Sequence, residues 1–494
     1  MSANAFLTKD IVETWNAQTE TTELLSDAGF SDSEWVNQQL ETEADSNGIE
    51  RPKGYTVSFH YNPRVEDHHF GGKHPMKPWR LTLTKQLVLG YGLQFAMDMW
   101  QSSASTKVDL ARFHDVGYLD FLQRVTRGDE KSELFQKFQF GDDCPIFEGM
   151  WEYCTLYAGA SVHAAEKLVT DQSDIAINWS GGLHHAKKMQ ASGFCYINDI
   201  VLAIQDLLTQ HPRVMYIDID VHHGDGVEQA FWSTDRVLTL SYHKFDYQNF
   251  FPGTGALDDT GPADIANPGA HYSLNVPLRD GIEDMQYIKL FHSTCGACIN
   301  HYDPTAIVLQ CGADSLGGDR LGKFNLNIRA HGACVEFVKR QCHNRKLLII
   351  GGGGYTPRNV ARTWCHETSL CVGASLRDEL PNHIPYRRAF ETPVNGDGRL
   401  YPRLDNLPSP KHHVNEHTEE YLRQIEENIY EQLRYIKGAP SVMMQYIPVD
   451  YLKVRMEEED VLREEEQMME SKKAETKRKR KEKDVGARGE YRGV

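Results

Sequence analysis

The chain has 494 residues, of which 40% are hydrophobic, and a formal net charge of −17 at pH 7. At about 150 residues per domain, this length corresponds to roughly three domains, unless one large α/β sheet takes up most of the chain. The composition excludes collagen, a coiled coil and disorder along the whole chain. The negative charge argues against direct, sequence-specific DNA binding and favours a basic substrate or partner.

The apolar segments and the cysteines limit the class of protein further. No apolar run reaches the roughly 18 residues of a membrane-spanning helix, and the N-terminus lacks the features of a signal peptide. Ten cysteines are too few for a disulfide scaffold and indicate reduced thiols in a cytosolic or nuclear protein. Cys295 and Cys298 lie in an amphipathic pattern without a second CxxC, which favours two buried helix cysteines over a metal site.

The first part of the chain is acidic. Residues 1–50 contain eleven Asp or Glu, one Lys and few large apolar residues, without a sustained hydrophobic period. We therefore predict that residues 1–53 form an acidic, largely disordered leader. Short partner-binding helices around Trp15 and Trp35 are an alternative for this stretch.

The last part of the chain is also charged. We predict that residues 438–494 form an extended tail, which is acid-rich from Glu457 to Glu466 and basic from Lys472 to Lys483. The basic part is either a solvated charged helix or a nuclear localisation signal. We expect the protein in the nucleus, with a cytoplasmic pool.

Residues 54–437 have the composition of a folded domain. Short apolar runs without polar alternation are typical of buried parallel strands, and amphipathic stretches separate them. Such runs occupy residues 175–179, 214–219, 237–241, 306–310 and 347–350. Helices are predicted over residues 199–208, before Pro212, and after Thr418. The alternation predicts an α/β fold with a single large, doubly wound, mostly parallel sheet flanked by helices.

Polar residues concentrate where the predicted strands end, which is where open α/β sheets bind ligands. Asp218, Asp220 and His222 alternate along one strand end and so point to one side, and Asp314 follows another strand. Buried carboxylates beside an imidazole are costly to desolvate unless a cation lies among them. We predict Asp220, His222 and Asp314 as the ligands of one catalytic Zn²⁺, with Asp218 as their outer partner. A metal-free hydrogen-bond network is the alternative.

Three further residues at the strand ends carry candidate chemistry. His184 and His185 lie among glycines, and we expect them to act as general base and acid, oriented by Asp218 and Asp225. Tyr355 follows four glycines and is predicted to donate a hydrogen bond to a carbonyl oxygen that becomes an oxyanion. A glycine-rich phosphate loop is the weaker interpretation, because no GK[ST] follows.

Over about residues 55–436 the chain resembles the class I histone deacetylases, which are zinc-dependent enzymes of the arginase/deacetylase fold. The matching motifs occur in one order at residues 74–78, 141–145, 178–188, 193–199, 218–226, 251–255, 310–320 and 351–358. The pattern is most similar to fungal members related to the animal isoform held in corepressor complexes. The resemblance implies zinc-dependent hydrolysis of the acetyl amide of N6-acetyl-lysine on histone tails, in transcriptional repression within chromatin. It also implies that residues 54–437 are the deacetylase catalytic domain.

The resemblance implies the substrate-binding residues as well. Asp143 would grip the substrate backbone at the rim, and the others would line a channel for the lysine side chain: Gly193, Phe194, Phe251 and Leu321. Independently of the resemblance, the residues themselves suggest aromatic channel walls at Phe194 and Phe251.

Two more ligand sites follow from the resemblance alone. A structural K⁺ would be held mostly through main-chain oxygens of Asp218, Asp220, His222, Ser241 and Tyr242. Three basic residues match positions that bind an inositol phosphate where a corepressor subunit docks: Lys77, Arg320 and Arg358. The expected partners are therefore acetylated histone tails and the subunits of a corepressor complex.

Two other functions remain open on the sequence. A small-molecule amidohydrolase acting on acetylpolyamines, or a ureohydrolase with two Mn²⁺, would keep the fold. The second Mn²⁺ of a ureohydrolase would need more bridging carboxylates than Asp218 and Asp220 provide. A non-catalytic scaffold for a complex would be expected to lack a metal ligand or Tyr355, and the sequence retains all of them.

Overall fold

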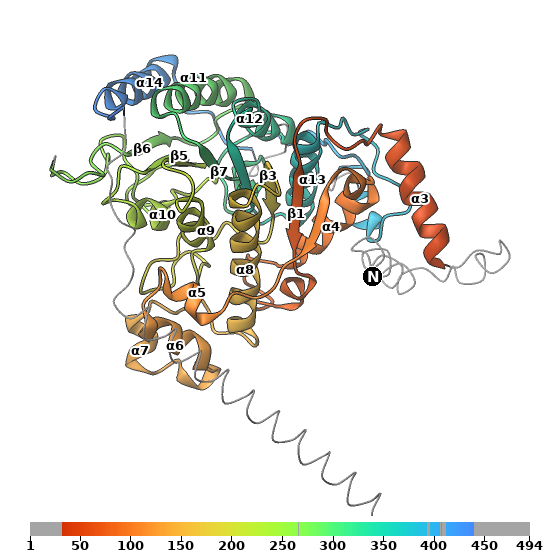
Figure 1. Ribbon diagram of the computed structural model, residues 1–494, viewed down its shortest axis with the longest axis horizontal. Helices are drawn as coiled ribbons and strands as arrows, with labels where there is room; N and C mark the ends of the chain where they lie inside the picture. Colours follow the sequence, from red (N-terminus) through yellow and green to blue (C-terminus); the bar gives the residue numbers. More distant parts are fainter. Residues whose placement is uncertain (1–31, 265, 393–395, 406, 408–411, 439–494) are drawn as a thin grey trace, which may run out of the picture.

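One eight-stranded sheet lies at the centre of the protein (Figure 1). The structure is a computed structural model that describes residues 32–264, 266–392, 396–405, 407 and 412–438. Within these residues the strands are β1 Val57–Tyr61, β2 Asp98–Gln101, β3 Ile175–Asn178, β4 Val214–Asp218, β5 Val237–Lys244, β6 Ser273–Leu278, β7 Ala306–Gln310 and β8 Lys346–Ile350. Their order is β2-β1-β3-β8-β7-β4-β5-β6, and every pair is parallel. The predicted single, large parallel sheet is confirmed.

The five strands in the middle of the sheet are those that the apolar runs predict, namely β3, β8, β7, β4 and β5. The outer strands β1, β2 and β6 were not predicted. Ser58 in β1 and Asn275 in β6 are polar yet buried, and β6 also contains Pro277. The Asn275 amide donates to Glu228 Oε2 at 2.9 Å, so its burial is compensated by a hydrogen bond. Buried polar side chains of this kind interrupt the apolar runs from which a strand is predicted.

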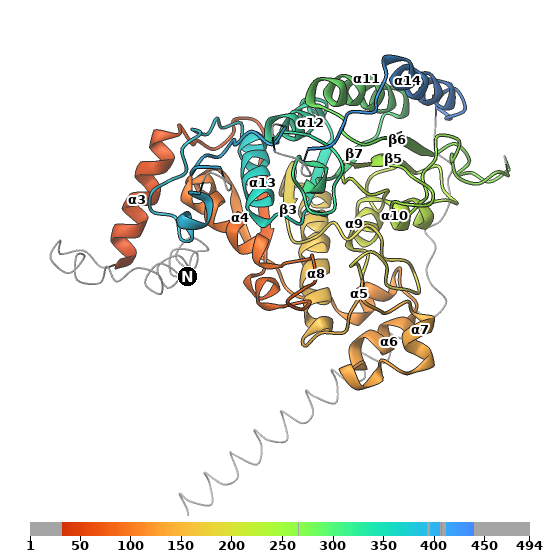
Figure 2. The ribbon, with the colours of Figure 1, turned by 180° about the vertical axis from the view of Figure 1, so that it is seen from behind.

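Helices cover both faces of the sheet, which makes it doubly wound (Figures 1 and 2). On one face α8 (Met150–Val169), α9 (Asp199–Leu207) and α10 (Asp225–Ala230) pack against Ala176 and Leu348. On the other face α4 (Trp79–Gly90), α11 (Asp284–Tyr302), α12 (Ile328–Arg340) and α13 (Pro357–Val372) pack against Ile177 and Ile349. Neighbouring residues of one strand therefore face opposite cores, which is why the central strands β3, β4, β7 and β8 are mostly apolar.

The last described helix, α14 (Glu419–Leu433), lies on α11 and matches its prediction. Thr418 caps its N-terminus by accepting a hydrogen bond from the Tyr421 amide. Its buried stripe consists of Leu422, Ile425, Ile429 and Leu433. In α11, Cys295 and Cys298 are free thiols that are fully buried, as the amphipathic pattern predicts.

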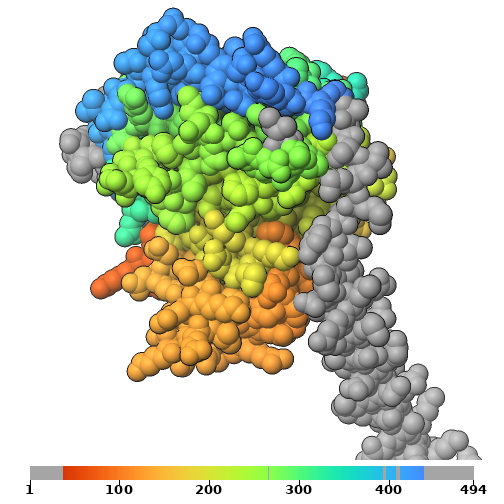
Figure 3. Space-filling model, turned by 90° about the vertical axis from the view of Figure 1, so that its left-hand side faces the viewer, coloured from red at the N-terminus to blue at the C-terminus, as the bar shows by residue number. Residues whose placement is uncertain are grey.

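A second hydrophobic core lies beyond the sheet, where α5 (Lys107–Ala111), α6 (Val116–Arg124) and α7 (Glu133–Lys137) pack near the first half of α8. Figure 3 shows α6 and α7 at the opposite end of this face from α14, with the segments after β5 between them. Leu183 and Ala186 belong to this core and Tyr355 packs against it. The core therefore supports the loops at the strand ends.

Part of the predicted leader is folded. Residues 32–46 form helix α3 (Asp32–Ser46), in which Leu40 and Ala44 are buried in the hydrophobic core that includes α4 and α13. Glu43 pairs with Arg377 at 2.7 Å. For residues 32–53 the structure thus differs from the predicted disorder, because a short apolar stripe is enough to dock a helix on an existing core. Residues 1–31 and the charged tail from residue 439 lie outside the described residues.

Within the described ranges, none of the helices has the length and apolar character required to cross a membrane.

Candidate active site

Three predicted metal ligands converge at the ends of two neighbouring strands. Asp220 and His222 follow β4, and Asp314 lies in the short helix η4 (Ala313–Ser315) after β7, which pairs with β4. One ligand atom from each side chain lies within 4.8 Å of the other two. His222 Nδ1 is 3.1 Å from Asp220 Oδ1 and 3.0 Å from Asp314 Oδ2, and all three residues are buried.

Surrounding groups orient the two carboxylates. The outer oxygen of Asp220, Oδ2, accepts hydrogen bonds from Gln310 Nε2 at 3.0 Å and from the Gly353 amide at 2.8 Å. The outer oxygen of Asp314, Oδ1, accepts from the Val221 amide at 2.9 Å. The other oxygen of each carboxylate therefore faces His222. A Cβ atom at Gly353 would lie 2.1 Å from Asp314 Oδ2, so only glycine fits beside the carboxylates.

Burial and mutual interactions shift the pKa values of the groups in this cluster. Burial raises the pKa of Asp314 to about 7, and the neighbouring Asp220 carboxylate adds to the shift. Burial also opposes the charged form of His222, but hydrogen bonds to both carboxylates outweigh it and raise its pKa to about 10. Two carboxylates and one imidazole, buried and preoriented around one point, are a donor set that fits a divalent ion such as Zn²⁺.

The structure brings each catalytic histidine next to its predicted carboxylate. His184 Nδ1 is 2.7 Å from Asp218 Oδ2, and His185 Nδ1 is 2.7 Å from Asp225 Oδ1. The two imidazole rings lie side by side, with centroids 3.9 Å apart. His184 Nε2 also lies 3.9 Å from Asp220 Oδ2, so the histidine pair adjoins the cluster of metal ligands.

The two histidines differ in their electrostatic surroundings. Burial lowers the pKa of His184, but the carboxylates of Asp218 and Asp220 outweigh it and raise the pKa to about 9. Burial lowers the pKa of His185 to about 3, and the adjacent His184 contributes in the same direction. A proton on His184 therefore disfavours a second proton on the adjacent His185.

The predicted channel residues surround the histidine pair. The Phe251 ring lies 4.9 Å from the His185 ring, and the Phe194 ring lies 5.6 Å from the Tyr355 ring. A Cβ atom at Gly193 would lie 2.4 Å from the His185 ring and 2.8 Å from Phe251. Phe251 is 43% exposed, so this wall reaches the surface.

Several supporting residues were not predicted, because their partners are distant in sequence. Asp319 accepts hydrogen bonds from the amides of Leu321 at 2.9 Å and Tyr355 at 2.8 Å, and so joins two predicted site residues. His74 lies 3.2 Å from the carbonyl oxygen of the exposed Asp143, and its ring packs on Phe194 at 4.6 Å. For His74, the available signal in the sequence was the motif at residues 74–78, one of those on which the family resemblance rests.

The residues predicted for K⁺ lie on adjacent strands, where Asp218 in β4 pairs with Ser241 in β5. The side chain of Tyr242 points elsewhere, since its hydroxyl is 2.6 Å from Thr294 Oγ1. Of Tyr242, therefore, only the main-chain oxygen could be a ligand at the predicted K⁺ position.

The three basic residues predicted for an inositol phosphate lie on loops that meet near Tyr355. Lys77 donates to the carbonyl oxygens of Gly71 and Gly72 at 2.9 and 3.0 Å, and Arg320 is exposed. The loops are joined by Arg80, which donates to the Gly354 carbonyl at 2.8 Å, and by Thr356, which donates to the Gly318 carbonyl at 3.3 Å. Arg358 lies two residues after Thr356, at the start of α13.

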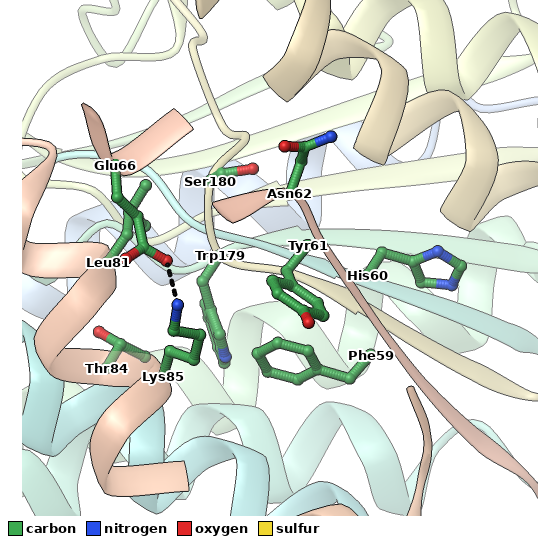
Figure 4. A pocket seen from close by; sticks show the side chains of 10 residues that line it. All are labelled: Phe59, His60, Tyr61, Asn62, Glu66, Leu81, Thr84, Lys85, Trp179 and Ser180. Carbon is green, nitrogen blue, oxygen red and sulfur yellow. Dashed lines mark ion pairs between the residues drawn. The ribbon is translucent and has the colours of Figure 1, made fainter. Parts of the chain in front are cut away.

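A small cavity of about 30 Å³ lies between β1, the end of β3 and α4 (Figure 4). Lys85 and Glu66 form an ion pair of 3.2 Å at its edge, and both side chains are largely buried. Trp179 and Ser180 also line the cavity. Its volume suits a single water molecule, and it contains none of the predicted site residues.

Comparison with known proteins agrees with this geometry. Residues 74–371 match the histone deacetylase domain family. The chain is 48% identical to histone deacetylase 1 from Homo sapiens over 397 residues, which cover 80% of this chain and 78% of that protein. The same values hold for histone deacetylase 1 from Bos taurus and from Rattus norvegicus. The predicted family is confirmed: the chain belongs to the histone deacetylases, as a class I member.

Proposed function

We propose that this enzyme removes the acetyl group from N6-acetyl-lysine on histone tails, using one Zn²⁺ per chain held by Asp220, His222 and Asp314. The observation that carries the proposal is the convergence of these three ligand atoms within 4.8 Å, beside two histidine–aspartate pairs. When bound, the metal would supply a Lewis acid that polarises the acetyl carbonyl and activates water.

The histidine pair supplies the proton transfers. Because Nδ1 of His184 and of His185 is hydrogen-bonded to a carboxylate, the proton exchanged with the substrate is carried at Nε2. The pair takes a proton from the attacking water and later gives a proton to the departing lysine nitrogen. Asp218 and Asp225 hold the rings in position and stabilise their charged form. The C–N bond breaks, and the products are acetate and a lysine amine.

Tyr355 acts on the oxygen of the acetyl group. Burial raises the pKa of its phenol well above the usual value, so the hydroxyl keeps its proton. A protonated phenol can donate a hydrogen bond to the carbonyl oxygen as negative charge develops on it. The contact with Phe194 and the amide hydrogen bond to Asp319 hold this residue beside the channel.

The channel would bind the substrate through its lysine side chain. Phe194 and Phe251 form apolar walls for the methylene groups, and Gly193 and Leu321 complete the lining. Asp143 is exposed near the rim and would accept hydrogen bonds from the substrate backbone.

We also propose the two further ligands that the family resemblance implies. The main-chain oxygens of Asp218, Asp220, His222, Ser241 and Tyr242 would hold a structural K⁺, which the pairing of β4 with β5 supports. Lys77, Arg320 and Arg358 would bind an inositol phosphate, supported by the meeting of their loops near Tyr355.

The cellular setting is part of the same proposal. The curated relatives are named histone deacetylases, and a net charge of −17 complements a basic histone tail. We propose residues 54–437 as the catalytic domain, acting in the nucleus, with a cytoplasmic pool, within a corepressor-type complex.

Acetate release measures the proposed activity directly. The purified chain, with and without inositol phosphate and nuclear extract as a source of corepressor subunits, would be incubated with an acetylated histone-tail peptide. Acetylspermidine would be the competing substrate. We expect acetate from the peptide at a kcat/KM at least about tenfold above that for acetylspermidine, together with one zinc per chain. Preference for the polyamine, or two metal ions per chain, would favour the small-molecule hydrolase, and no acetate under any condition would favour a scaffold.

A further inference from the structure

A second hollow lies on the surface between α12 and α13, and the proposed catalytic site does not use it. Its volume is about 420 Å³, which is within the range of small-molecule sites. The polar side chains that line it are Arg329, Glu336, Lys339, His366, Ser369, Ser375 and Tyr401. None of these residues belongs to the proposed metal site, the lysine channel or the inositol phosphate site.

Arg329 is held in a fixed orientation by an aromatic ring. Its guanidinium carbon lies 3.9 Å from the centroid of the Tyr401 ring. Among the described residues the guanidinium has no hydrogen-bond or ion-pair partner, although it carries five N–H donors. This cation–π contact restrains the exposed guanidinium and leaves its N–H donors available for an oxyanion.

His366 offers a buried donor to the same hollow. The residue is only 8% exposed, and its Nδ1 is 3.0 Å from the Tyr401 hydroxyl. Burial lowers the pKa of His366 to about 3, and the nearby Arg329 contributes, so the ring is neutral. Burial raises the pKa of the Tyr401 phenol, so this hydroxyl donates to Nδ1 and the ring proton is on Nε2.

The Nε2 atom of His366 has no hydrogen-bond partner within the described ranges. A Cβ atom at Gly332, another residue of the hollow, would lie 2.6 Å from it. The absence of a side chain at Gly332 therefore leaves this edge of the imidazole open. A ligand oxygen in the hollow can therefore accept the Nε2 proton.

Lys339 adds a second positive charge. Its ammonium group donates to the Leu370 carbonyl at 2.6 Å, which leaves two N–H donors. The acidic residue of the hollow, Glu336, already pairs with Arg340 on the same helix. The hollow is thus rich in donors and positive, although the protein as a whole is strongly negative.

We propose that this hollow binds a small molecule through a phosphate group, with Arg329 as the bidentate anchor and Lys339 and His366 Nε2 as further donors. Two cations and a neutral donor suit a group with several oxygens and a charge near −2 better than a single carboxylate. The proposal does not depend on the deacetylation chemistry, because none of its residues contacts the proposed metal ligands.

Phosphate binding would be measured on the full zinc-loaded chain in which Lys77, Arg320 and Arg358 are replaced by alanine, so that the proposed inositol phosphate site does not contribute. The probe is inorganic phosphate, with acetate in a parallel titration, and binding is followed by calorimetry. Arg329→Met should weaken phosphate binding at least about tenfold, because the anchor is lost. Arg423→Met, which removes one positive charge on α14 away from the hollow, is the control and should change binding less than twofold.

A local signal shows where the phosphate binds. In protein labelled with ¹⁵N-histidine, the resonance that disappears in the His366→Gln variant should shift with added phosphate, and this shift should be absent in Arg329→Met. The proposal is overturned if Arg329→Met binds phosphate as well as the parent does, if the His366 resonance does not respond, or if acetate binds as tightly as phosphate.

Discussion

Two adjacent residues, His222 and His223, point into two different buried clusters of the same residue types. In the cluster of His223, each ring nitrogen meets one partner: Nδ1 is 2.8 Å from Thr254 Oγ1 and Nε2 is 3.1 Å from Glu228 Oε2. In the cluster of His222, one nitrogen meets the oxygens of two carboxylates, Asp220 and Asp314.

The difference lies in the number of protons available. An imidazole has at most one proton on Nδ1, and around His222 two carboxylate oxygens compete for it, whereas each ring nitrogen of His223 has one partner of its own. A cation fits the first cluster and is not required by the second. Residue types alone do not separate a metal site from a structural network, but the count of donors and acceptors does.

The cluster around His223 also supports the segment that carries Phe251, a residue of the proposed channel. His243, which stacks near His223 at 4.5 Å, lies 2.8 Å from the Gly255 carbonyl, while His223 holds Thr254. These contacts fix the end of the segment that carries Phe251. The two clusters are therefore expected to fail in different ways, one in chemistry and the other in substrate fit and stability.

The largest effect is expected from Asp314→Asn. Replacing one carboxylate should prevent tight metal binding, and the loss of several kcal/mol of Lewis-acid stabilisation corresponds to more than about a thousandfold in kcat. Acetate release from an acetylated histone peptide measures it. The neighbouring network offers a control, since Glu228→Gln should keep its zinc; retention of zinc and turnover by Asp314→Asn would contradict the assignment.

Tyr355→Phe should come next, with a decrease in kcat of at least about a hundredfold from loss of one donor to the developing oxyanion. Zinc content and folding should be unchanged, because the hydroxyl is not a metal ligand. Steady-state kinetics together with metal analysis check this. A variant with normal kcat would show that Tyr355 only lines the channel.

The ion pair of Lys85 and Glu66 at the small cavity tests whether a buried charge there also depends on its partner. Lys85→Met removes the ammonium group that forms an ion pair with the largely buried Glu66 and should lower the free energy of unfolding by about 3 kcal/mol. Chemical denaturation measures this loss. The double variant Lys85→Met, Glu66→Met should be clearly more stable than the single one; if both lose the same amount, the broken ion pair is not the cause.

The smallest effect is expected from Thr254→Val, which removes one hydrogen bond to His223 and should cost about 1 kcal/mol of stability. Because the affected segment carries Phe251, KM should rise a few-fold while kcat and zinc content stay near those of the parent. Michaelis–Menten kinetics separate the two constants. A fall in kcat with unchanged KM would place the His223 cluster in the chemistry instead.

The sequence was informative where local pattern and function coincide. The five central strands are continuous apolar runs because both faces of a parallel sheet are buried, and Asp220 and His222 alternate along one chain segment. The outer strand β6 escaped prediction because the amide of the buried Asn275 bonds to Glu228 and to the Asp259 carbonyl, which lie 47 and 16 residues away. Asp319 was missed for the same reason, since its link to Tyr355 exists only in the folded chain.

Helix α3, in the predicted leader, depends on a contact with a segment that is distant in sequence. Helix α3 presents only a few buried residues, such as Leu40 and Ala44, so a helix around Trp35 was only the alternative to the predicted disordered leader. It folds because the surface around Gly92 receives Ala44 at close range, where a Cβ atom on the glycine would lie 2.5 Å from that of the alanine. Docking surfaces of this kind cannot be read from either segment alone.

Metal analysis of two neighbouring variants tests the central claim most directly. His222→Ala and His223→Gln would be purified side by side and their zinc per chain determined. The donor count predicts that His222→Ala loses its zinc, whereas His223→Gln retains about one ion per chain, as the parent does. Equal zinc in both variants, whether retained or lost, would contradict the distinction between the two clusters.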